Sequence, residues 1–403
     1  MKADLPIYSA MEFKNVDILF PNAGRDARKN MRDALAALDD GGTRAEIQNR
    51  YGVIVGVAGA NLSVARGEIS VLMGLSGSGK STLLRAANGL NPVTRGAVLV
   101  RDGDSSIDVA NCDRLQMRRL RRERVAMVFQ QFGLLPWRTV RENVGFGLEL
   151  RGDSIAKRKA IVDEKLELVG LTQWSERNVG ELSGGMQQRV GLARAFATDA
   201  DILLMDEPFS ALDPLIRGKL QDELLQLQAR VKKTILFVSH DLDEALKLGD
   251  RISILQNGRI IQTGTAEDIV LAPADEYVAE FVQHMNPLTV LTGSMIMQRR
   301  EQLSGAGAVV WLDAARRYQL SLNATDEVLG LTLDGVAQAL RHVREDVDCG
   351  LTEPGLVVAP ASMSLRSIIQ LRQGSGHPVL VAEDGKILGV CGEGEIIRAL
   401  AGR

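Results

Sequence analysis

Aromatic residues are scarce in this chain of 403 residues, since phenylalanine, tryptophan and tyrosine together make up 4%. Proteins that bind single-stranded nucleic acid stack the bases on aromatic side chains, so this composition argues against such a surface. A net charge of −3 and an isoelectric point of about 6.0 give no basis for binding polyanions either. We therefore expect no nucleic acid partner.

Cysteine and long apolar runs are also scarce. The three cysteines, Cys112, Cys349 and Cys391, are odd in number and lack metal-ligand spacing, which favours a reducing compartment. Nowhere do about 18 apolar residues follow one another, so we expect no membrane-spanning helix. Glu12 and Lys14 interrupt the N-terminal segment, which therefore lacks the apolar core of a signal peptide. Action at a membrane would require partners.

A glycine-rich loop, GLSGSGKS, follows the apolar segment 69–73 and precedes a segment of helical composition. This is the context of a Walker A phosphate loop, whose backbone N–H groups surround the β-phosphate while the helix dipole adds positive potential. Lys80 is expected to reach the β- and γ-phosphates, and the Ser81 hydroxyl to bind Mg²⁺. The residues expected to bind nucleotide here are Gly74, Ser76, Gly77, Ser78, Gly79, Lys80, Ser81 and Thr82.

Two acids end a second apolar run, ILLMDE at 202–207. A buried strand of this kind brings its last residue to the edge of the sheet where open α/β folds bind ligands. We expect Asp206 to hold the Mg²⁺ and Glu207 to act as the general base towards the attacking water. Together with the phosphate loop, this strand predicts a P-loop NTPase.

Composition and spacing predict an α/β fold around these motifs. Continuous apolar strands favour a parallel sheet covered by helices. Thr139 and Glu142 fit a capping box, and Asn257–Gly258 fits a hairpin turn. We expect helices at 25–40, at 115–124 and over most of 139–168. In the tail we expect a strand, a turn at Asp384–Gly385, a second strand and a helix, all within 377–402. The other strands are expected within 1–20, 53–57, 69–73, 97–103, 125–130, 200–208, 234–241, 251–256 and 259–264.

The segment LSGGMQQR, at Leu182–Arg189, stands before the two acids. Ser183 followed by Gly184 and Gly185 predicts a helix N-terminus with exposed N–H groups, which is a second anion site. The segment closely resembles the signature sequence of ABC-type nucleotide-binding proteins. The resemblance implies a homodimer of two head-to-tail subunits with two ATP molecules between them, so that Ser183, Gly184 and Gly185 contact the ATP of the partner.

Three further positions match the motifs of that family. The resemblance implies that Gln130 is the Q-loop glutamine, which contacts Mg²⁺ and water and reports to the membrane subunit. It also implies that Ser210–Asp213 is the D-loop at the dimer interface, with Asp213 near the nucleotide, and that His240 is the switch histidine that contacts the γ-phosphate. Singly, a glutamine or histidine at the end of a strand is more often structural.

ABC proteins usually stack the adenine base on an aromatic residue upstream of the phosphate loop. Tyr51 lies at the customary distance and is favoured, because the insertion 21–50 separates Phe20 from the usual place. The segment 130–150 contains Phe132, Leu134, Leu135 and Trp137. In the family this region receives a coupling helix of the permease; the alternative is that these side chains form internal core.

Residues 11–285 resemble the ATPases of quaternary-amine importers, which serve choline and glycine betaine. We expect an ABC ATP-binding domain at 1–285, with the insertion 21–50 and a helical subdomain at about 131–190. The tail, 286–403, resembles a cystathionine-β-synthase (CBS) module best in 357–402, whereas 318–348 departs from that pattern. This α+β tail either senses a signal or provides packing.

The resemblance implies separate transmembrane permease subunits and, indirectly, an extracytoplasmic solute-binding protein. The ATPase would then lie peripherally at the cytoplasmic face of the bacterial inner membrane. Three alternatives are an importer ATPase for amino acids or other small solutes, a soluble ABC protein of DNA repair or translation, and a non-hydrolysing regulatory module. The chain has a single phosphate loop and no sustained heptads, which argues against a soluble protein of DNA repair or translation. The presence of Glu207 and His240 argues against a non-hydrolysing module.

Overall fold

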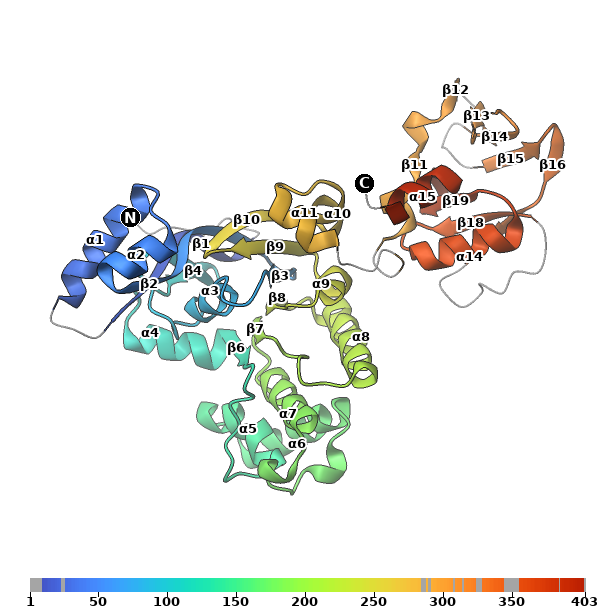
Figure 1. Cartoon of the computed structure of the whole chain (residues 1–403). Helices are drawn as coiled ribbons and strands as arrows, with labels where there is room; N and C mark the ends of the chain where they lie inside the picture. Colours follow the sequence, from blue (N-terminus) through green and yellow to red (C-terminus); the bar gives the residue numbers. More distant parts are fainter. Residues whose placement is uncertain are drawn as a thin grey trace. The chain divides into compact units, whose positions relative to one another are not determined.

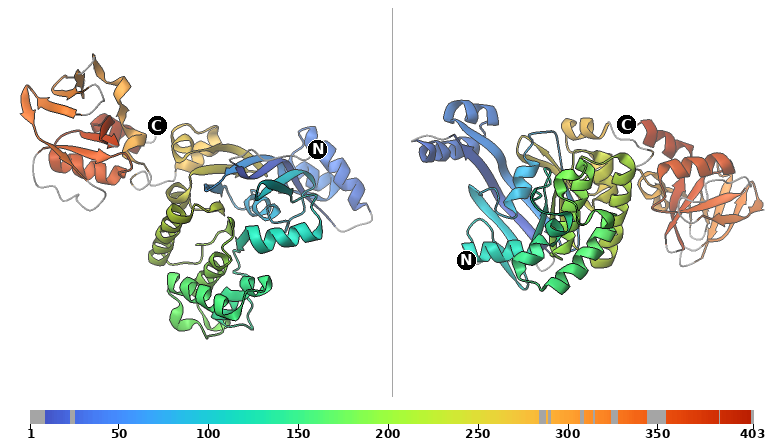
Figure 2. Two further views of the ribbon diagram at one scale, coloured as in Figure 1. Left: turned by 180° about the vertical axis from the view of Figure 1, so that it is seen from behind. Right: turned by 90° about the horizontal axis from the view of Figure 1, so that it is seen from below.

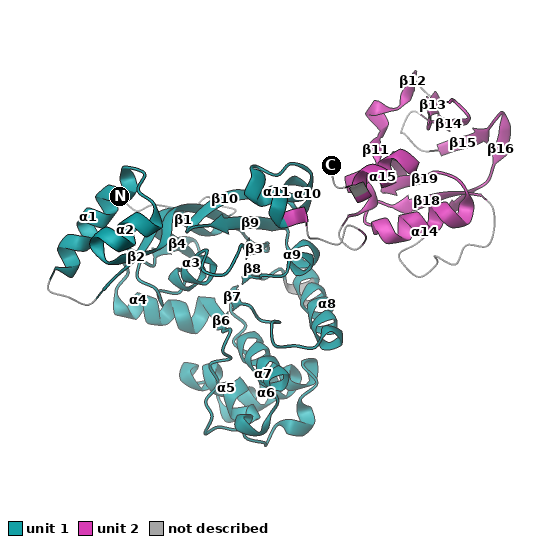
Figure 3. Ribbon diagram, viewed as in Figure 1, with its two compact units in different colours: residues 1–281 teal, residues 282–403 magenta. Residues whose placement is uncertain are grey.

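The computed structural model of the chain has two compact units, residues 1–281 and 282–403 (Figure 3). None of the described helices combines the length and the apolar composition that crossing a bilayer requires. The change of composition near residues 286–287 lies outside the described residues. The structure describes residues 9–22, 26–283, 288, 291–306, 309–313, 315–323, 328–343, 355–383 and 385–401.

The first sheet of unit 1 is antiparallel and has the strand order β2-β1-β4-β5. β1 and β2 pair from Ser9↔Ala65 to Pro21↔Val53, and the segment between them carries the helices α1 and α2. The predicted insertion is therefore a helical pair on the connection of a long hairpin. The strands are β1 (Ser9–Pro21), β2 (Val53–Ala65), β4 (Arg95–Asp102) and β5 (Ser105–Asp108).

The second sheet has the order β10-β9-β3-β8-β7-β6, in which all neighbours are parallel except β10 and β9. Parallel strands bring their carboxyl ends to the same edge, so the residues after β3, β7 and β8 meet there. The predicted turn is confirmed, since Asn257 and Gly258 have φ of +49° and +82°. The strands are β3 (Ile69–Met73), β6 (Val125–Val128), β7 (Ile202–Asp206), β8 (Thr234–Val238), β9 (Arg251–Gln256) and β10 (Arg259–Gly264).

Helices α5, α6 and α7 pack on one another at one end of unit 1, as Figures 1 and 2 show. The predicted capping box at the start of α5 is confirmed, because the Thr139 hydroxyl accepts from the Glu142 N–H and the Glu142 carboxylate accepts from the Thr139 N–H. The predicted basic helix is α4 continued by a π-helical turn at Leu120–Arg124. The α-helices described in unit 1 are α1 (Ala27–Asp39), α2 (Arg44–Tyr51), α3 (Lys80–Ala86), α4 (Arg114–Arg119), α5 (Val140–Arg151), α6 (Ile155–Leu168), α7 (Gly184–Ala197), α8 (Pro214–Val231), α9 (Leu242–Leu248), α10 (Ala266–Leu271) and α11 (Glu276–Gln283), the last of which extends two residues past the unit boundary.

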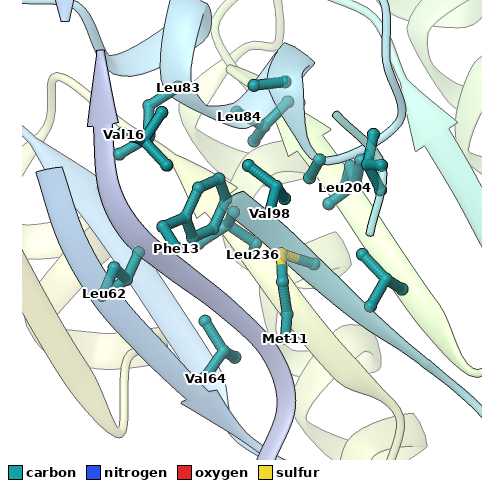
Figure 4. Packing of buried hydrophobic residues seen from close by; sticks show 14 of the residues in the cluster. Met11, Phe13, Val16, Leu62, Val64, Leu83, Leu84, Val98, Leu204 and Leu236 are labelled. Atoms are coloured by element: carbon teal, nitrogen blue, oxygen red, sulfur yellow. The ribbon is translucent and has the colours of Figure 1, made fainter. Parts of the chain in front are cut away.

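The core of unit 1 lies where α3 passes between the two sheets (Figure 4). Phe13 of the antiparallel sheet, Leu84 of α3 and Leu236 of the parallel sheet are fully buried together. Burial of each such side chain contributes about 1.5–3 kcal/mol. Because α3 follows the glycine-rich loop directly, this packing fixes the loop on the edge of the parallel sheet.

Unit 2 contains a mixed sheet of order β11-β20-β19-β18-β17 and an antiparallel sheet of order β12-β13-β14-β15-β16. The predicted strand, strand and helix near the C-terminus are confirmed as β19, β20 and α15; Asp384 of the predicted turn lies outside the described residues. The elements are α13 (Gly293–Ile296), β11 (Gln298–Arg299), β12 (Ser304–Ala306), β13 (Val309–Trp311), β14 (Tyr318–Leu322), β15 (Val328–Leu333), β16 (Val336–Gln338), β17 (Leu340–His342), β18 (Leu356–Pro360), α14 (Leu365–Ser375), β19 (Val379–Glu383), β20 (Lys386–Cys391) and α15 (Glu393–Ala401).

Arg95 connects the antiparallel sheet to the insertion. Its Nε donates to Asp17 Oδ2 at 2.6 Å, and its two terminal nitrogens donate to the Asp39 carboxylate. The Asp17 side chain is only 2% exposed, and its carboxylate also accepts a hydrogen bond from the Gly59 N–H. Without Arg95, this buried carboxylate would lose its ion pair and keep the bond from Gly59. We expect Arg95→Ala to lower the free energy of unfolding by about 1–3 kcal/mol in urea denaturation.

Arg177→Ala is the matched control for this prediction. Arg177 pairs with Glu181 on the surface, where both side chains are exposed. Loss of such a pair changes the free energy of unfolding by less than about 1 kcal/mol. An Arg95→Ala chain that is as stable as the Arg177→Ala chain would show that the buried carboxylate does not depend on Arg95.

Candidate functional site

The glycine-rich loop joins β3 to α3 and leaves no room for side chains at two of its glycines. Gly74 and Gly79 have φ of +138° and +106°, and a Cβ on them would lie 2.1 Å from Leu255 O and 2.5 Å from Gly56 O. Only glycine fits such a loop. Ser76 and Gly77 lie exposed at its tip, whereas the Ser78 hydroxyl is buried and has no hydrogen-bond partner among the described residues.

Lys80 is buried inside this loop. Its Nζ donates to Gly74 O at 2.8 Å and to Leu75 O at 3.0 Å, so the ammonium lies within the ring of the loop backbone. Burial lowers the pKa of Lys80 from its ordinary value, and the carboxylates of Glu207 and Asp206 oppose that shift. A cation enclosed by a glycine-rich backbone, beside an orphaned hydroxyl, fits a polyphosphate.

Asp206 ends β7 and is fully buried. Its Oδ1 accepts from the Ser81 hydroxyl at 2.7 Å, and its Oδ2 accepts from Arg85 Nε at 3.1 Å and Nη2 at 2.8 Å. A hydroxyl and a carboxylate oxygen in contact are ligands that Mg²⁺ accepts. Arg85 was not among the predicted site residues, although its spacing of four from Ser81 places both on one face of α3.

The side chains of Glu207, Gln130 and His240, which the sequence predicts to act in hydrolysis, lie together. Gln130 Nε2 donates to Glu207 Oε2 at 2.9 Å, and His240 Nδ1 lies 3.5 Å from the same oxygen. Glu207 has φ of +49°, which is uncommon for a residue with a side chain. Its N–H donates to Val238 O at 3.1 Å, so the turn after β7 is held against the end of β8.

The tip of α7 faces solvent within the single chain. Ser183 caps the helix by accepting from the Met186 N–H, and both Ser183 and Gly184 are exposed. A Cβ on Gly184 would meet nothing within 4 Å, whereas one on Gly185 would lie 3.3 Å from Leu212. The predicted second anion site is therefore open to another molecule.

Gln188 links α7 to the turn after β7 and was not predicted. This buried side chain donates to Glu207 O at 3.2 Å and accepts from the Ala211 N–H at 3.2 Å. Asp213 caps α8 by accepting from the Ile216 N–H at 3.0 Å. Gln188 thus joins the signature helix to the backbone of Glu207 and of Ala211.

The two candidates for the adenine platform, Tyr51 and Phe20, lie in different surroundings. Tyr51 packs partly buried in the hydrophobic cluster of the insertion, and the Arg50 guanidinium lies 5.3 Å from its ring centre. The Phe20 ring instead lies beside the phosphate loop. A Cβ on Gly56 would be 2.8 Å from Phe20 Cε2 and 3.0 Å from Thr82 Cγ2, so the two side chains flank the same glycine. Of the two candidates, Phe20 is the one that lies beside the start of α3, directly after the phosphate loop.

The apolar segment after Gln130 divides between core and surface. Leu134 packs partly buried against the hydrophobic cluster of α5–α7, and Phe132 and Leu135 are also half-buried. Trp137 is 74% exposed. Core packing accounts for Leu134 but not for Trp137, whose large apolar surface is available to a partner.

The comparisons with known proteins agree with this geometry. A family model described as ABC transporter matches residues 57–210. The glycine betaine transport ATP-binding protein OpuAA of Bacillus subtilis is 40% identical over 400 residues, which cover 98% of this chain and 94% of that protein. The trimethylamine N-oxide transport system ATP-binding protein TmoW of Ruegeria pomeroyi is 49% identical over 245 residues, which cover 61% of this chain and 71% of that protein.

A solved structure extends the likeness to three dimensions. The ATP-binding cassette MJ0796, in a dimeric post-hydrolysis state bound to ADP and phosphate, has a TM-score of 0.53 and 30% sequence identity, and the match covers 63% of this chain and 98% of that one. The Bacillus relative, by contrast, matches through both compact units. Since that match extends well beyond the residues of the family model, the chain belongs to the ABC transporter family, as one of its ATP-binding proteins.

Proposed function

We propose that the chain hydrolyses ATP to energise import of a quaternary amine, such as glycine betaine or choline, through a separate permease. The observation that carries this proposal is the 40% identity to the glycine betaine protein over 98% of the chain, C-terminal unit included. The described helices include none that could span a membrane, so the pore would have to come from other subunits.

Glu207 is the proposed general base and would accept a proton from the attacking water. Gln130 and His240 both contact its Oε2, so they would hold the carboxylate and, once the nucleotide is bound, the water and the γ-phosphate. Lys80 would leave the carbonyls of Gly74 and Leu75 for the phosphates. Positioned donors that meet developing charge are the main source of catalysis in phosphoryl transfer.

Mg²⁺ would be held by Ser81, Asp206 and Gln130. The metal ion, when bound, neutralises charge on the β- and γ-phosphates. Ser81 and Asp206 already lie in hydrogen-bond contact, and Arg85 fixes the second oxygen of that carboxylate. Two of the three proposed ligands thus lie together without the ion, whereas Gln130 contacts Glu207.

Two copies would complete each site head to tail. The exposed tip of α7, with Ser183, Gly184 and Gly185, would bind the γ-phosphate of the partner's ATP, and Asp213 would lie at the interface. Leu215, two residues after the D-loop, is 82% exposed, which fits a surface that a second subunit covers. The dimeric form of the similar cassette supports this arrangement.

The permease would dock on the segment after Gln130. Trp137 supplies exposed apolar surface there, and Gln130 connects this segment to Glu207. The protein would then lie peripherally at the cytoplasmic face of the inner membrane and serve an extracytoplasmic solute-binding protein indirectly. We expect no nucleic acid partner.

The C-terminal unit would be a CBS-like regulatory or packing module. The sequence β18, α14, β19, β20, α15 forms one β-α-β-β-α repeat, within the stretch 356–401. The strands β12 to β16 form an antiparallel sheet instead of a second repeat of this kind. A single repeat supports half of a CBS pair, which leaves both sensing and packing as possible roles.

Trimethylamine N-oxide is a second candidate cargo. The observation in its favour is the 49% identity to the Ruegeria protein over 245 residues. Uptake of labelled glycine betaine, choline and trimethylamine N-oxide should be measured in a strain that lacks this chain. We expect the chain, but not its Lys80→Ala variant, to restore uptake of a quaternary amine; restored uptake of other solutes alone would contradict the proposal.

Replacement of Glu207 by glutamine removes the proposed base and keeps the side-chain shape. We expect the Glu207→Gln chain to bind ATP, to form a stable dimer with ATP in size-exclusion chromatography, and to lose at least about 100-fold in ATP turnover. Glu164→Gln is the control, since Glu164 is an exposed acid on α6. Turnover within a few fold of the unmodified chain would exclude Glu207 as the base.

Removal of the proposed base platform should weaken nucleotide binding. We expect Phe20→Ala to raise the Kd of a fluorescent ATP analogue by about 5- to 150-fold, because stacking of a base contributes about 1–3 kcal/mol. Tyr51→Ala should change the same Kd less than twofold, since Tyr51 packs within the insertion. The opposite ranking would return the platform to Tyr51.

A further inference from the structure

Arg44 connects the insertion to the phosphate loop. It is the first residue of α2, directly after Thr43, whose side chain forms a capping box with Glu46. The Arg44 guanidinium donates from Nε to Val55 O at 2.6 Å, from Nη1 to Gly77 O at 3.0 Å and from Nη2 to Gly56 O at 3.2 Å. These bonds place a cation between β2 and the exposed tip of the loop.

The charge of Arg44 is not neutralised by these contacts. All three partners are backbone carbonyls, whereas Arg95 in the same unit pairs with two carboxylates. Burial lowers the pKa of Arg44, and no carboxylate among the described residues opposes that shift. Arginine nevertheless stays protonated in proteins. The phosphate loop therefore has a second positive group beside Lys80, oriented and half-buried.

A half-buried cation without a carboxylate is costly unless an anion compensates it. The nearest part of the molecule that is built for an anion is the phosphate loop, and Arg44 contacts Gly77 within it. Gly56, whose carbonyl accepts from Arg44, also borders Gly79 and the Phe20 ring. Arg44 thus lies where the phosphate loop meets the candidate base platform.

We propose that Arg44 is a nucleotide-recognition residue, whose charge strengthens binding of the polyphosphate of ATP and ADP. The inference rests on the proposed ATPase function and assigns a ligand role to the insertion. Three of the five guanidinium N–H groups are used by carbonyls, so the residue acts mainly through its positive charge and through the two N–H groups that are left. Its effect should therefore grow with the number of phosphates.

The test compares Arg44→Met and Arg44→Lys in the full chain. Kd values of fluorescent ATP, ADP and AMP are measured at low and high salt, together with the thermal unfolding midpoint without nucleotide. We expect Arg44→Met to raise the Kd of ATP about tenfold at low salt, that of ADP less and that of AMP least, with smaller ratios at high salt. Arg44→Lys keeps the charge and should stay within about threefold of the unmodified chain.

Arg50→Met is the matched control, because Arg50 lies on the same helix over the Tyr51 ring. It should leave all three Kd values within twofold. Unchanged Kd values in Arg44→Met with a lower unfolding midpoint would overturn the proposal and leave Arg44 as a structural link. Equal losses for ATP and AMP would overturn it as well, since they would indicate a contact with the base. If the unmodified chain and its Lys80→Ala variant bound ATP equally weakly, the proposed function itself would fail.

Discussion

The buried carboxylate of Asp206 is the constraint on which the site depends. A fully buried charge must be satisfied locally, and here a hydroxyl and a guanidinium from one helix, α3, provide the hydrogen bonds. These bonds hold the start of α3 against the end of β7, while the core residues of α3 pack between both sheets. The phosphate loop before α3 and the acid after β7 thereby acquire a fixed geometry before any ligand binds.

The same geometry connects the centre to surfaces that other molecules would use. The Glu207 carboxylate accepts a hydrogen bond from Gln130, which lies in the same segment as the exposed Trp137. The Glu207 backbone carbonyl accepts one from Gln188 of the signature helix. Glu207 therefore contacts the proposed permease segment through its carboxylate and the signature helix through its backbone carbonyl. Both contacts are direct hydrogen bonds to the turn after β7, one from the irregular segment after β6 and one from α7.

Local patterns in the sequence predicted most of the fold and the central motifs. The phosphate loop, the acids after β7 and the capped tip of α7 are each set by a few consecutive residues, so spacing alone was informative. Arg85, Gln188 and Phe20 depend on pairing between distant elements. The pairing of β1 with β2 places Phe20 opposite Ile54 and next to the phosphate loop. The 31 residues from Asn22 to Gly52 (22–52) separate these strands in the sequence, so their pairing could not be predicted. The sequence therefore favours Tyr51, because it is closer to the loop along the chain.

The central claim is that each of the two chains in the dimer contributes its phosphate loop to one reaction centre and its signature helix to the other. Chains with their three native cysteines replaced would carry either Leu75→Cys, at the exposed loop, or Glu181→Cys, before the signature helix, both with Glu207→Gln. Mixed and treated with a short bismaleimide, they should form a cross-linked dimer with ATP and none without nucleotide. Equal cross-linking with and without ATP, or none in the mixture, would contradict the account.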